Sequence, residues 1–110
     1  MVEQLKLRIL TGFYKPGERL PSVRELAVEC RVNPNTLQRA FGELEGLSLV
    51  INNRTLGRSI TEDAKLIETL RREVARGYLR DFLNGMGSLG FTDAEIILIL
   101  KEKERILSNG

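Results

Sequence analysis

Residues 20–27 read Leu-Pro-Ser-Val-Arg-Glu-Leu-Ala and residues 32–40 read Val-Asn-Pro-Asn-Thr-Leu-Gln-Arg-Ala, and these two stretches decide the fold. In the first stretch, Ser22 and Glu25 have the spacing of a capping box, in which the hydroxyl and the carboxylate satisfy free amides of the first helical turn. The pattern therefore predicts a helix that begins at Val23, with apolar residues three or four positions apart.

The second stretch predicts another helix after a short connection. Asn33 is the expected N-cap, and Pro34 suits the first helical position because the amide that proline lacks has no partner there. The preceding helix must end near Arg31, because Pro34 disfavours helical geometry at the residue before it. About three residues then separate the two helices, which is the length of a helix-turn-helix connection. The apolar residues of the second helix have helical spacing: Leu37, Ala40, Phe41 and Leu44.

The flanking segments complete a small domain. Residues 2–10 have the spacing of an amphipathic helix, which Gly12 is expected to close. Residues 47–51 and 55–60 favour two β-strands, and the turn signal Asn52-Asn53 lies between them, so a hairpin is predicted. Three helices followed by a hairpin is the element order of a winged helix-turn-helix, a mainly helical fold with one small β-hairpin.

A two-helix tail is predicted after the hairpin. Thr61 is the expected N-cap of a helix whose apolar residues keep helical spacing for more than twenty positions. The three glycines of residues 85–90 are expected to break that helix. Thr92 and Glu95 then form a second capping box, which opens a final helix containing the apolar run Ile96–Leu100.

The balance of charge changes between the two parts of the chain. Residues 1–60 contain nine Lys or Arg and six Asp or Glu, whereas residues 61–110 contain eight and nine. We therefore expect a winged helix-turn-helix domain over residues 1–60 and a helical dimerisation domain over residues 61–110. The positive excess lies in the first of them.

Two segments of the first domain have the chemistry of a nucleic-acid contact. Residues 32–40 and residues 52–59 contain no acidic side chain, so nothing in them repels phosphate. Asn, Thr and Gln side chains in the first segment can donate and accept hydrogen bonds at base edges. The N-terminus of a helix adds free amides and the positive end of the helix dipole. Double-stranded DNA is therefore the expected partner.

The two quoted stretches, with Lys15-Pro16-Gly17 before them, resemble the DNA-binding domain of GntR-type bacterial transcription regulators over residues 2–60. The short tail resembles the YtrA-type subfamily. The resemblance implies a recognition helix, about residues 34–45, in the major groove and a wing, about residues 52–60, near the DNA backbone or minor groove. The contacts that it implies are Arg24, Asn33, Asn35, Thr36, Gln38 and Arg39, with a wing glycine at Gly57.

The chain departs from the family pattern at three places. The family usually has glycine where this chain has Arg31, in the turn before the recognition helix, and again where it has Ser48, before the first wing strand. The family wing commonly reads Arg-Gly-x-Gly-Thr-Phe-Val, whereas residues 54–60 read Arg-Thr-Leu-Gly-Arg-Ser-Ile. The departures bear on the conformation of the wing and on its minor-groove contact.

Several of these side chains also have a second interpretation. Arg24 and Arg39 are either DNA contacts or ordinary solvated charges, and their place beside the groove-facing helix end favours contact. Asn33 is explained better as a helix cap than as a base reader. Arg54 and Arg58 either contact phosphate or keep an edge hairpin soluble.

The tail is expected to form a homodimer. Five consecutive large apolar residues, Ile96–Leu100, cannot all face one side of a helix, and a two-helix tail has too little surface to cover them. A two-fold interface lets the same apolar patch bury itself against its copy. The expected interface residues are Ile67, Leu70, Val74, Tyr78, Phe82, Ile96, Ile97, Ile99 and Leu100.

Composition argues against other classes of protein. One Cys and no His leave no Cys-rich zinc site and remove the commonest general base, so we expect no cofactor, no metal site and no enzyme activity. The acidic pair Glu62-Asp63 is explained more simply by a helix dipole than by catalysis. The N-terminus lacks the apolar stretch of a signal peptide, and the longest uncharged run, residues 82–92, is too short to span a membrane. A cytoplasmic protein without a membrane segment is expected.

The leading hypothesis is a sequence-specific DNA-binding transcription regulator. Analogy with the family makes it a dimeric repressor on a near-palindromic operator, with recognition helices about 34 Å apart or a multiple of that distance. The alternative is a winged helix that binds protein rather than DNA. An acidic recognition helix would have indicated that alternative, and this helix has no acid before Glu43. Whether a small-molecule effector controls binding is left open.

Overall fold

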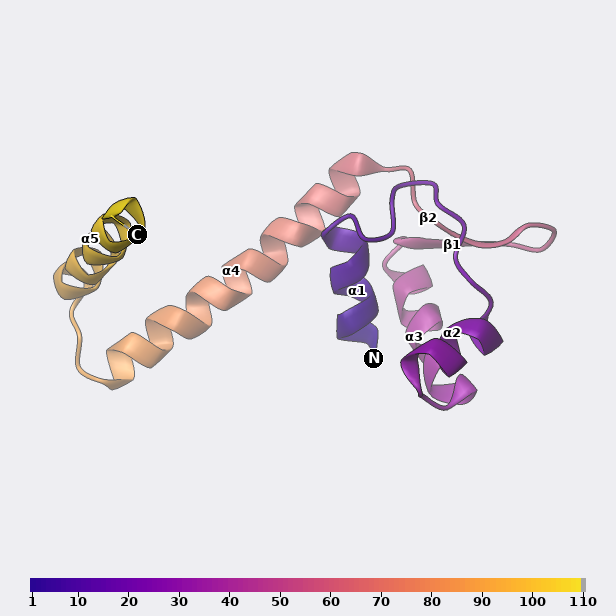
Figure 1. The fold of residues 1–110 in the computed structure, drawn as a ribbon, viewed down its shortest axis with the longest axis horizontal. Helices are drawn as coiled ribbons and strands as arrows, with labels where there is room; N and C mark the ends of the chain where they lie inside the picture. The colour runs from indigo at the N-terminus through magenta and orange to yellow at the C-terminus, as the bar shows by residue number, and fades with distance from the viewer. Residues whose placement is uncertain (110) are drawn as a thin grey trace. The chain divides into compact units, whose positions relative to one another are not determined.

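The computed structural model describes residues 1–109. Its elements are α1 (Val2–Leu10), α2 (Val23–Cys30), α3 (Pro34–Gly46), β1 (Val50–Asn53), β2 (Gly57–Ile60), α4 (Ala64–Ser88) and α5 (Asp93–Asn109) (Figure 1). The chain divides into two compact units, residues 1–72 and the residues from 73 onward, and α4 begins in the first and ends in the second. The predicted fold class, mainly helical with one small hairpin, is confirmed.

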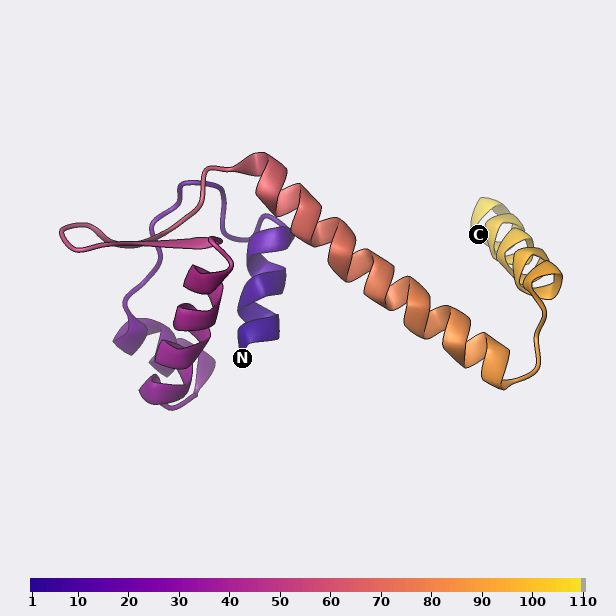
Figure 2. The ribbon, with the colours of Figure 1, turned by 180° about the vertical axis from the view of Figure 1, so that it is seen from behind.

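The first unit is built around α3, which contacts α1, α2 and β1. Figures 1 and 2 show α1 lying beside α3 from both sides of the molecule. Apolar residues of α3 recur every three or four positions, so they share one face, and that face is buried. The largest fully buried side chains come from three helices, the hairpin and the connection before it: Leu5, Leu26, Leu37, Phe41, Leu44, Leu49, Val50 and Ile60.

The predicted starts of α2 and α3 are confirmed by their caps. The Glu25 amide donates to the Ser22 hydroxyl oxygen at 3.1 Å, so an amide of the first helical turn that has no partner within the helix is hydrogen-bonded. The Asn35 amide donates to the Asn33 side-chain oxygen at 2.7 Å, and Pro34 occupies the first turn. The helix-turn-helix connection therefore has the length and the cap chemistry that the sequence predicts.

Both helices of this motif end in a left-handed residue that is not glycine. Arg31, after α2, has φ 56°, and Ser48, after α3, has φ 64°. In each case the next amide reaches back to the preceding helix: Val32 N donates to the Ala27 carbonyl, and Leu49 N donates to the Leu44 carbonyl, both at 3.0 Å. This is a Schellman ending, at which glycine is the usual residue because it has no Cβ. The two departures from the family glycines thus fall on the two strained positions.

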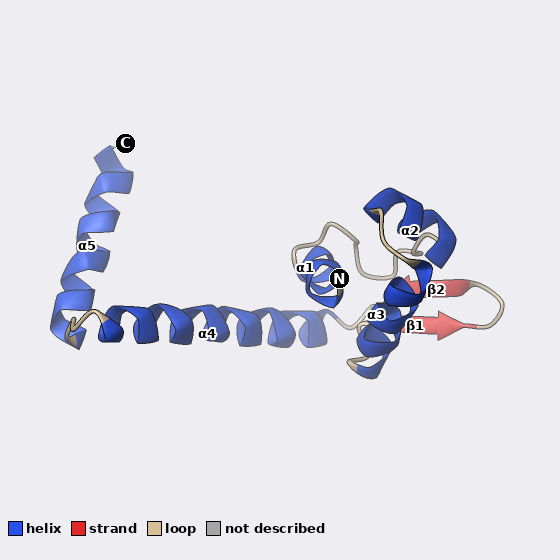
Figure 3. Cartoon of the chain, turned by 90° about the horizontal axis from the view of Figure 1, so that it is seen from below, coloured by secondary structure: helices blue, strands red, loops and turns tan. Residues whose placement is uncertain are grey.

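The hairpin forms, but its turn lies beyond the predicted Asn52-Asn53. The strands pair antiparallel from Val50 opposite Ile60 to Asn53 opposite Gly57, so residues 54–56 make the turn (Figure 3). The prediction was wrong because Asn53 caps the turn rather than forming it. Its side-chain oxygen accepts from the amides of Thr55, at 2.9 Å, and Leu56, at 3.2 Å.

The tail helices differ from the prediction in two details. Thr61 is buried, and the α4 start is capped two residues later, where the Leu66 amide donates to the Asp63 carboxylate at 3.0 Å. Gly85 and Gly87 lie inside α4 rather than ending it, because a helix interior tolerates glycine at a cost of about 1 kcal/mol. Gly90, with φ 87°, is the glycine after which the chain turns.

The predicted capping box of α5 is confirmed in both directions. The Glu95 amide donates to the Thr92 hydroxyl oxygen at 3.2 Å, and the Thr92 amide donates to the Glu95 carboxylate at 3.1 Å. Within residues 1–109, no single helix is long and apolar enough to cross a bilayer, and only α4 and α5 taken together across their bend would reach that length and composition.

Candidate nucleic-acid interface

The exposed face of α3 begins at its N-terminus. Leu37 and Ala40 turn inward and are buried, and this burial orients the residues between them toward solvent. Asn33 uses its side-chain oxygen to cap the helix, as described above, which favours the cap interpretation of that residue. The other predicted base-reading and phosphate-binding residues of this helix are all exposed: Asn35, Thr36, Gln38 and Arg39. The structure thus brings four predicted contacts together on one helical face.

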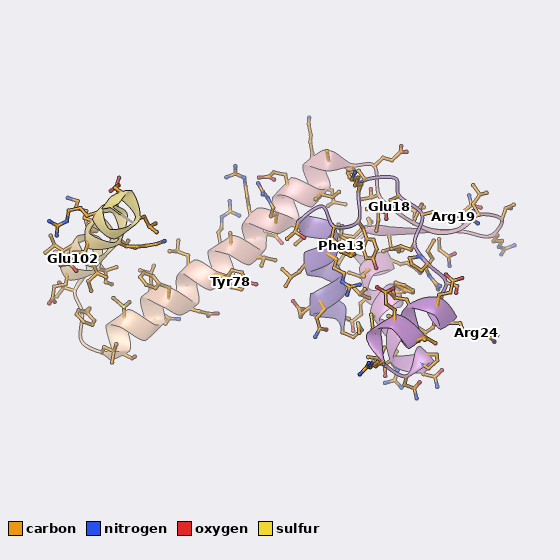
Figure 4. The ribbon with its side chains drawn as sticks, in the orientation of Figure 1. Phe13, Glu18, Arg19, Arg24, Tyr78 and Glu102 are labelled. Carbon is orange, nitrogen blue, oxygen red and sulfur yellow. The ribbon has the colours of Figure 1, made fainter. Side chains whose placement is uncertain are left out.

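Arg24 lies in the first turn of α2 and is exposed. Figure 4 shows its side chain extending outward from α2, away from the rest of the first unit. None of the ion pairs found among residues 1–109 involves Arg24 or Arg39, so both guanidinium groups are available to an anionic partner. This exposure is what a phosphate contact requires, although an ordinary solvated charge has it as well.

The tip of the wing is exposed, and side-chain hydrogen bonds close its turn. Arg54 lies in the turn, where the Asn53 side chain holds the following amides. Gly57 has φ 83°, and a Cβ atom there would meet nothing within 4 Å, so its conformation rather than crowding explains the glycine. Leu56 is 59% exposed between these two residues.

Arg58 has a different environment from Arg54. Its Nε donates to the Glu45 carboxylate at 2.7 Å, and its guanidinium carbon lies 5.0 Å from the centre of the Phe41 ring. Its side chain is only 19% exposed. The structure therefore places Arg58 between the wing and α3 and separates it from the exposed residues at the tip.

A further residue, Arg19, lies at this surface and was not predicted. The chain around the start of the first quoted stretch pairs with β2 through an isolated β-bridge between Arg19 and Ser59, and Leu20 N donates to the Arg58 carbonyl at 2.9 Å. The exposed Arg19 side chain lies along this edge (Figure 4). The pairing joins residues forty positions apart, so no local pattern in the sequence indicates it.

A cleft of about 410 Å³ separates the start of α2 from the wing. Its lining combines basic and hydrogen-bonding side chains with one acid, Glu25. The lining residues include Arg19, Ser22, Asn52, Leu56 and Arg58. Concave polar surface between a helix-turn-helix and a wing is a shape that can follow a nucleic-acid backbone.

The predicted dimer residues lie in α4 and α5 with different degrees of exposure. Leu70 and Ile96 are buried within the single chain, and Ile67, Val74 and Ile99 are partly buried. The remaining members are exposed: Tyr78, Phe82, Ile97 and Leu100. Figure 4 shows Tyr78 projecting from α4 and Glu102 from α5.

Other apolar residues of the tail are exposed and were not predicted. Leu98, inside the apolar run, is 59% exposed, and both Leu79 and Leu83 of α4 face solvent. The exposed apolar surface of residues 73–109 is therefore larger than the predicted set. Helical spacing selects one stripe of α4, and Leu79 and Leu83 lie beside that stripe.

The described part of the chain holds no group of three or more Cys, Asp or Glu side chains arranged to bind a metal ion. What the first unit offers is a helix-turn-helix whose second helix presents exposed amide, hydroxyl and guanidinium groups beside a β-hairpin. These features define the class of winged helix-turn-helix DNA-binding proteins.

Comparisons with known proteins identify the family. Residues 1–59 match the family described as bacterial regulatory proteins, gntR family. The HTH-type transcriptional regulator YhcF of Bacillus subtilis is 37% identical over 97 residues, covering 88% of this chain and 80% of YhcF. The HTH-type transcriptional repressor YtrA of the same organism is 45% identical over 65 residues, covering 59% of this chain and 50% of YtrA.

A solved structure agrees with the sequence matches. A GntR family transcriptional regulator from Listeria monocytogenes superposes with a TM-score of 0.84 at 39% identity, covering 92% of this chain and 89% of that one. The chain therefore belongs to the GntR family of bacterial transcription regulators, and the relatives that it matches are described as transcription regulators. The resemblance stated from the sequence is confirmed.

Proposed function

We propose that the protein is a dimeric repressor that binds a near-palindromic DNA operator in the cytoplasm. The observation that carries the proposal is the α3 face on which Asn35, Thr36, Gln38 and Arg39 are exposed together, with no acidic neighbour before Glu43. Asn and Gln pair with adenine edges, and Arg binds guanine edges or phosphate. These residues read bases in the major groove, whereas Asn33 caps the helix.

The flanking residues supply the sequence-independent part of binding. Arg24 from α2, Arg19 from the wing edge and Arg54 from the wing tip are exposed on the first unit. Each phosphate contact by Arg releases condensed counterions, so affinity falls with rising salt. Because Gly57 has no side chain, its backbone approaches the DNA closely. Repression is supported by the name of the relative YtrA, and it follows physically when a bound dimer covers a promoter.

The dimer is supported by the exposed apolar surface of the tail. Tyr78, Phe82 and Ile97 are exposed in the single chain, and apolar patches of this kind mark interfaces. A two-fold axis through the tail places one recognition helix on each operator half-site, about 34 Å apart or a multiple of that distance. The domains that serve these two roles are residues 1–60 for DNA and residues 61–110 for dimerisation.

The test is selection of bound duplexes from a random DNA library, followed by titrations of the selected operator at several salt concentrations. Gln38→Ala should reduce discrimination at one base position by about 1–3 kcal/mol. Arg24→Ala should weaken binding to all sequences and reduce the salt slope by about one. Arg72→Ala, an exposed α4 arginine far along the chain from α3, is the matched control.

Two results would contradict the proposal. A library that yields no enriched sequence would favour the protein-binding alternative for the winged helix. An enriched sequence without two-fold symmetry would contradict the proposal that the protein binds DNA as a dimer. Transcription in vitro from a promoter that overlaps the selected operator should fall when the protein is added, and a rise would identify an activator.

A further inference from the structure

Arg58 lies in β2 and has backbone partners on both sides. Its backbone lies opposite Asn52 of β1 on one side, and on the other side its carbonyl accepts from the Leu20 amide at 2.9 Å. Pairing with β1 on one side and the hydrogen bond from Leu20 on the other hold the main chain in place, so the pleat sets the direction of the Arg58 side chain. That side chain faces α3 and not the tip of the wing.

Two contacts join Arg58 to the recognition helix. The 2.7 Å hydrogen bond from Arg58 Nε to Glu45 is charge-assisted, and such bonds are stronger than neutral ones. The guanidinium also lies over the face of Phe41, whose ring is 1% exposed and belongs to the core under α3. The side chains of Arg58 and Glu45 are 19% and 30% exposed, so water screens the pair less than it screens a surface ion pair.

The partner positions fit a geometric role. Glu45 is in the last turn of α3, and its carbonyl accepts from the Ser48 amide in the turn that leads into β1. The contact therefore joins the end of the recognition helix to the middle of the returning wing strand. Position 58 is also one of the places where the wing departs from the pattern Arg-Gly-x-Gly-Thr-Phe-Val, in which threonine stands there.

We propose that Arg58 and Glu45 are positioning residues that lock the wing against the recognition helix, so that both meet DNA at a fixed relative angle. Arg58 then acts through the wing tip and does not itself bind phosphate. The tip at Thr55 is three residues from Arg58, about 10 Å along an extended strand, so a small rotation at the contact displaces it by an appreciable fraction of a groove width. The inference rests on the proposed function, because it assigns a role within DNA binding.

The first test measures the lock without DNA. NMR relaxation of the amides of residues 54–57 reports motion of the wing tip on the picosecond to nanosecond timescale. Arg58→Ala and Glu45→Ala should each lower the order parameters of these amides, and those of α3 should not change. The charge-reversed pair Glu45→Arg with Arg58→Glu should restore them in part. Unchanged wing order parameters in both single variants would overturn the lock.

The second test uses hydroxyl-radical footprinting on the selected operator, which separates contacts by the recognition helix from contacts by the wing. Arg58→Ala and Glu45→Ala should remove the protection at the sugars beneath the wing and weaken binding on the order of tenfold, while protection beneath α3 persists. The reversed pair should regain the wing protection. Arg58→Lys and Glu45→Gln provide milder changes if an alanine variant unfolds.

The control is a second ion pair of the same chain. Arg72 Nε donates to Glu68 at 2.9 Å on the exposed surface of α4, and reversal of that pair should leave the footprint unchanged. A salt slope that falls by about one in Arg58→Ala, with the wing protection retained and no effect of Glu45→Ala, would make Arg58 a phosphate contact and overturn the inference. If the wild type selects no DNA, the proposed function fails. The relaxation measurement still shows whether Arg58 and Glu45 hold the wing against α3.

Discussion

The two units of this protein bury their apolar residues to very different degrees. In the first unit Leu26, Leu37 and Leu44 are 0% exposed. In the second unit Leu89 is 73% exposed and Leu98 is 59% exposed. In the first unit, α1, α2 and the hairpin pack against α3 and enclose a core. The described residues of the second unit form the end of α4 and α5. Segments of fewer than about 40 residues usually need disulfides, metals or oligomerisation to be stable.

Under the proposed function, this difference divides DNA recognition and dimerisation between two parts of one short chain. The first unit encloses its own core, so its outer face is free to carry polar groups for DNA. The second unit leaves its apolar residues open, and a second copy of the chain supplies the missing surface in the proposed dimer. Each unit thus exposes the side chains that its partner requires.

Truncation of one leucine in each unit gives the largest expected contrast. Leu44→Ala should lower the free energy of unfolding by about 2–5 kcal/mol, because it leaves a cavity in a closed core. Leu83→Ala, at a site 41% exposed, should lower it by less than half as much in dilute protein. Urea unfolding followed by circular dichroism measures both values. Equal losses would show that the tail is as closed as the first unit.

A charge placed on the tail surface should separate the two copies. Leu98→Glu should weaken dimerisation by at least about a hundredfold, since a charge at an interface core must be desolvated. The isolated chain tolerates the change because position 98 is exposed. Sedimentation equilibrium measures the dissociation constant, with Thr69→Glu as the matched control. A dimer that survives the substitution would exclude this surface from the interface.

Glycine at the two left-handed positions should stabilise the first unit. Arg31→Gly and Ser48→Gly each relieve a positive φ at a helix end, and each should raise the free energy of unfolding by about 1 kcal/mol. Arg31→Ala is the control, because alanine keeps the Cβ that causes the strain. Thermal unfolding gives the comparison, and an equal gain from alanine would assign the effect to the lost arginine side chain instead.

The smallest expected effect concerns a surface ion pair on α4. Hydrogen bonds from Arg71, and then its charge, lower the pKa of the Glu68 carboxyl group below its ordinary value. The resulting stabilisation is fully present above the unfolded pKa of about 4.3 and is lost as the pH falls through the lower folded pKa. Glu68→Gln should therefore lower the melting temperature slightly at pH 7 and not at about pH 2. A difference that persists in acid would point to packing instead of charge. Glu73→Gln is the control.

Features that depend on neighbours in the chain were predictable from the sequence. The caps at Ser22, Asn33 and Thr92 each involve a side chain and an amide two or three residues away. The wing turn was misplaced by only a few residues, because an Asn-Asn pair signals a turn without saying which residue caps it. The prediction that Gly85 and Gly87 end α4 was wrong. Each glycine costs a helix interior only about 1 kcal/mol, which is too little to interrupt a long helix.

The recognition face could also be inferred from the sequence, because helical periodicity puts Leu37 and Ala40 inside and so leaves Gln38 and Arg39 outside. The place of Arg19 beside the wing could not, since it depends on strand pairing across forty residues. The extent of the exposed tail surface was underestimated for a similar reason. Which apolar residues of α4 and α5 are buried depends on the tertiary arrangement, including the turn at Gly90, and spacing alone does not specify it.

The sequence by itself determined the elements, the helix-turn-helix connection and the family, since these follow from local hydrogen bonds, backbone preferences and apolar spacing. Tertiary structure alone decided the role of Arg58. In the sequence it is one of two arginines in an acid-free wing, equivalent in charge to Arg54. Only the fold brings it within 2.7 Å of Glu45 and over the ring of Phe41, because strand pairing decides which wing side chains face the core and which face outward.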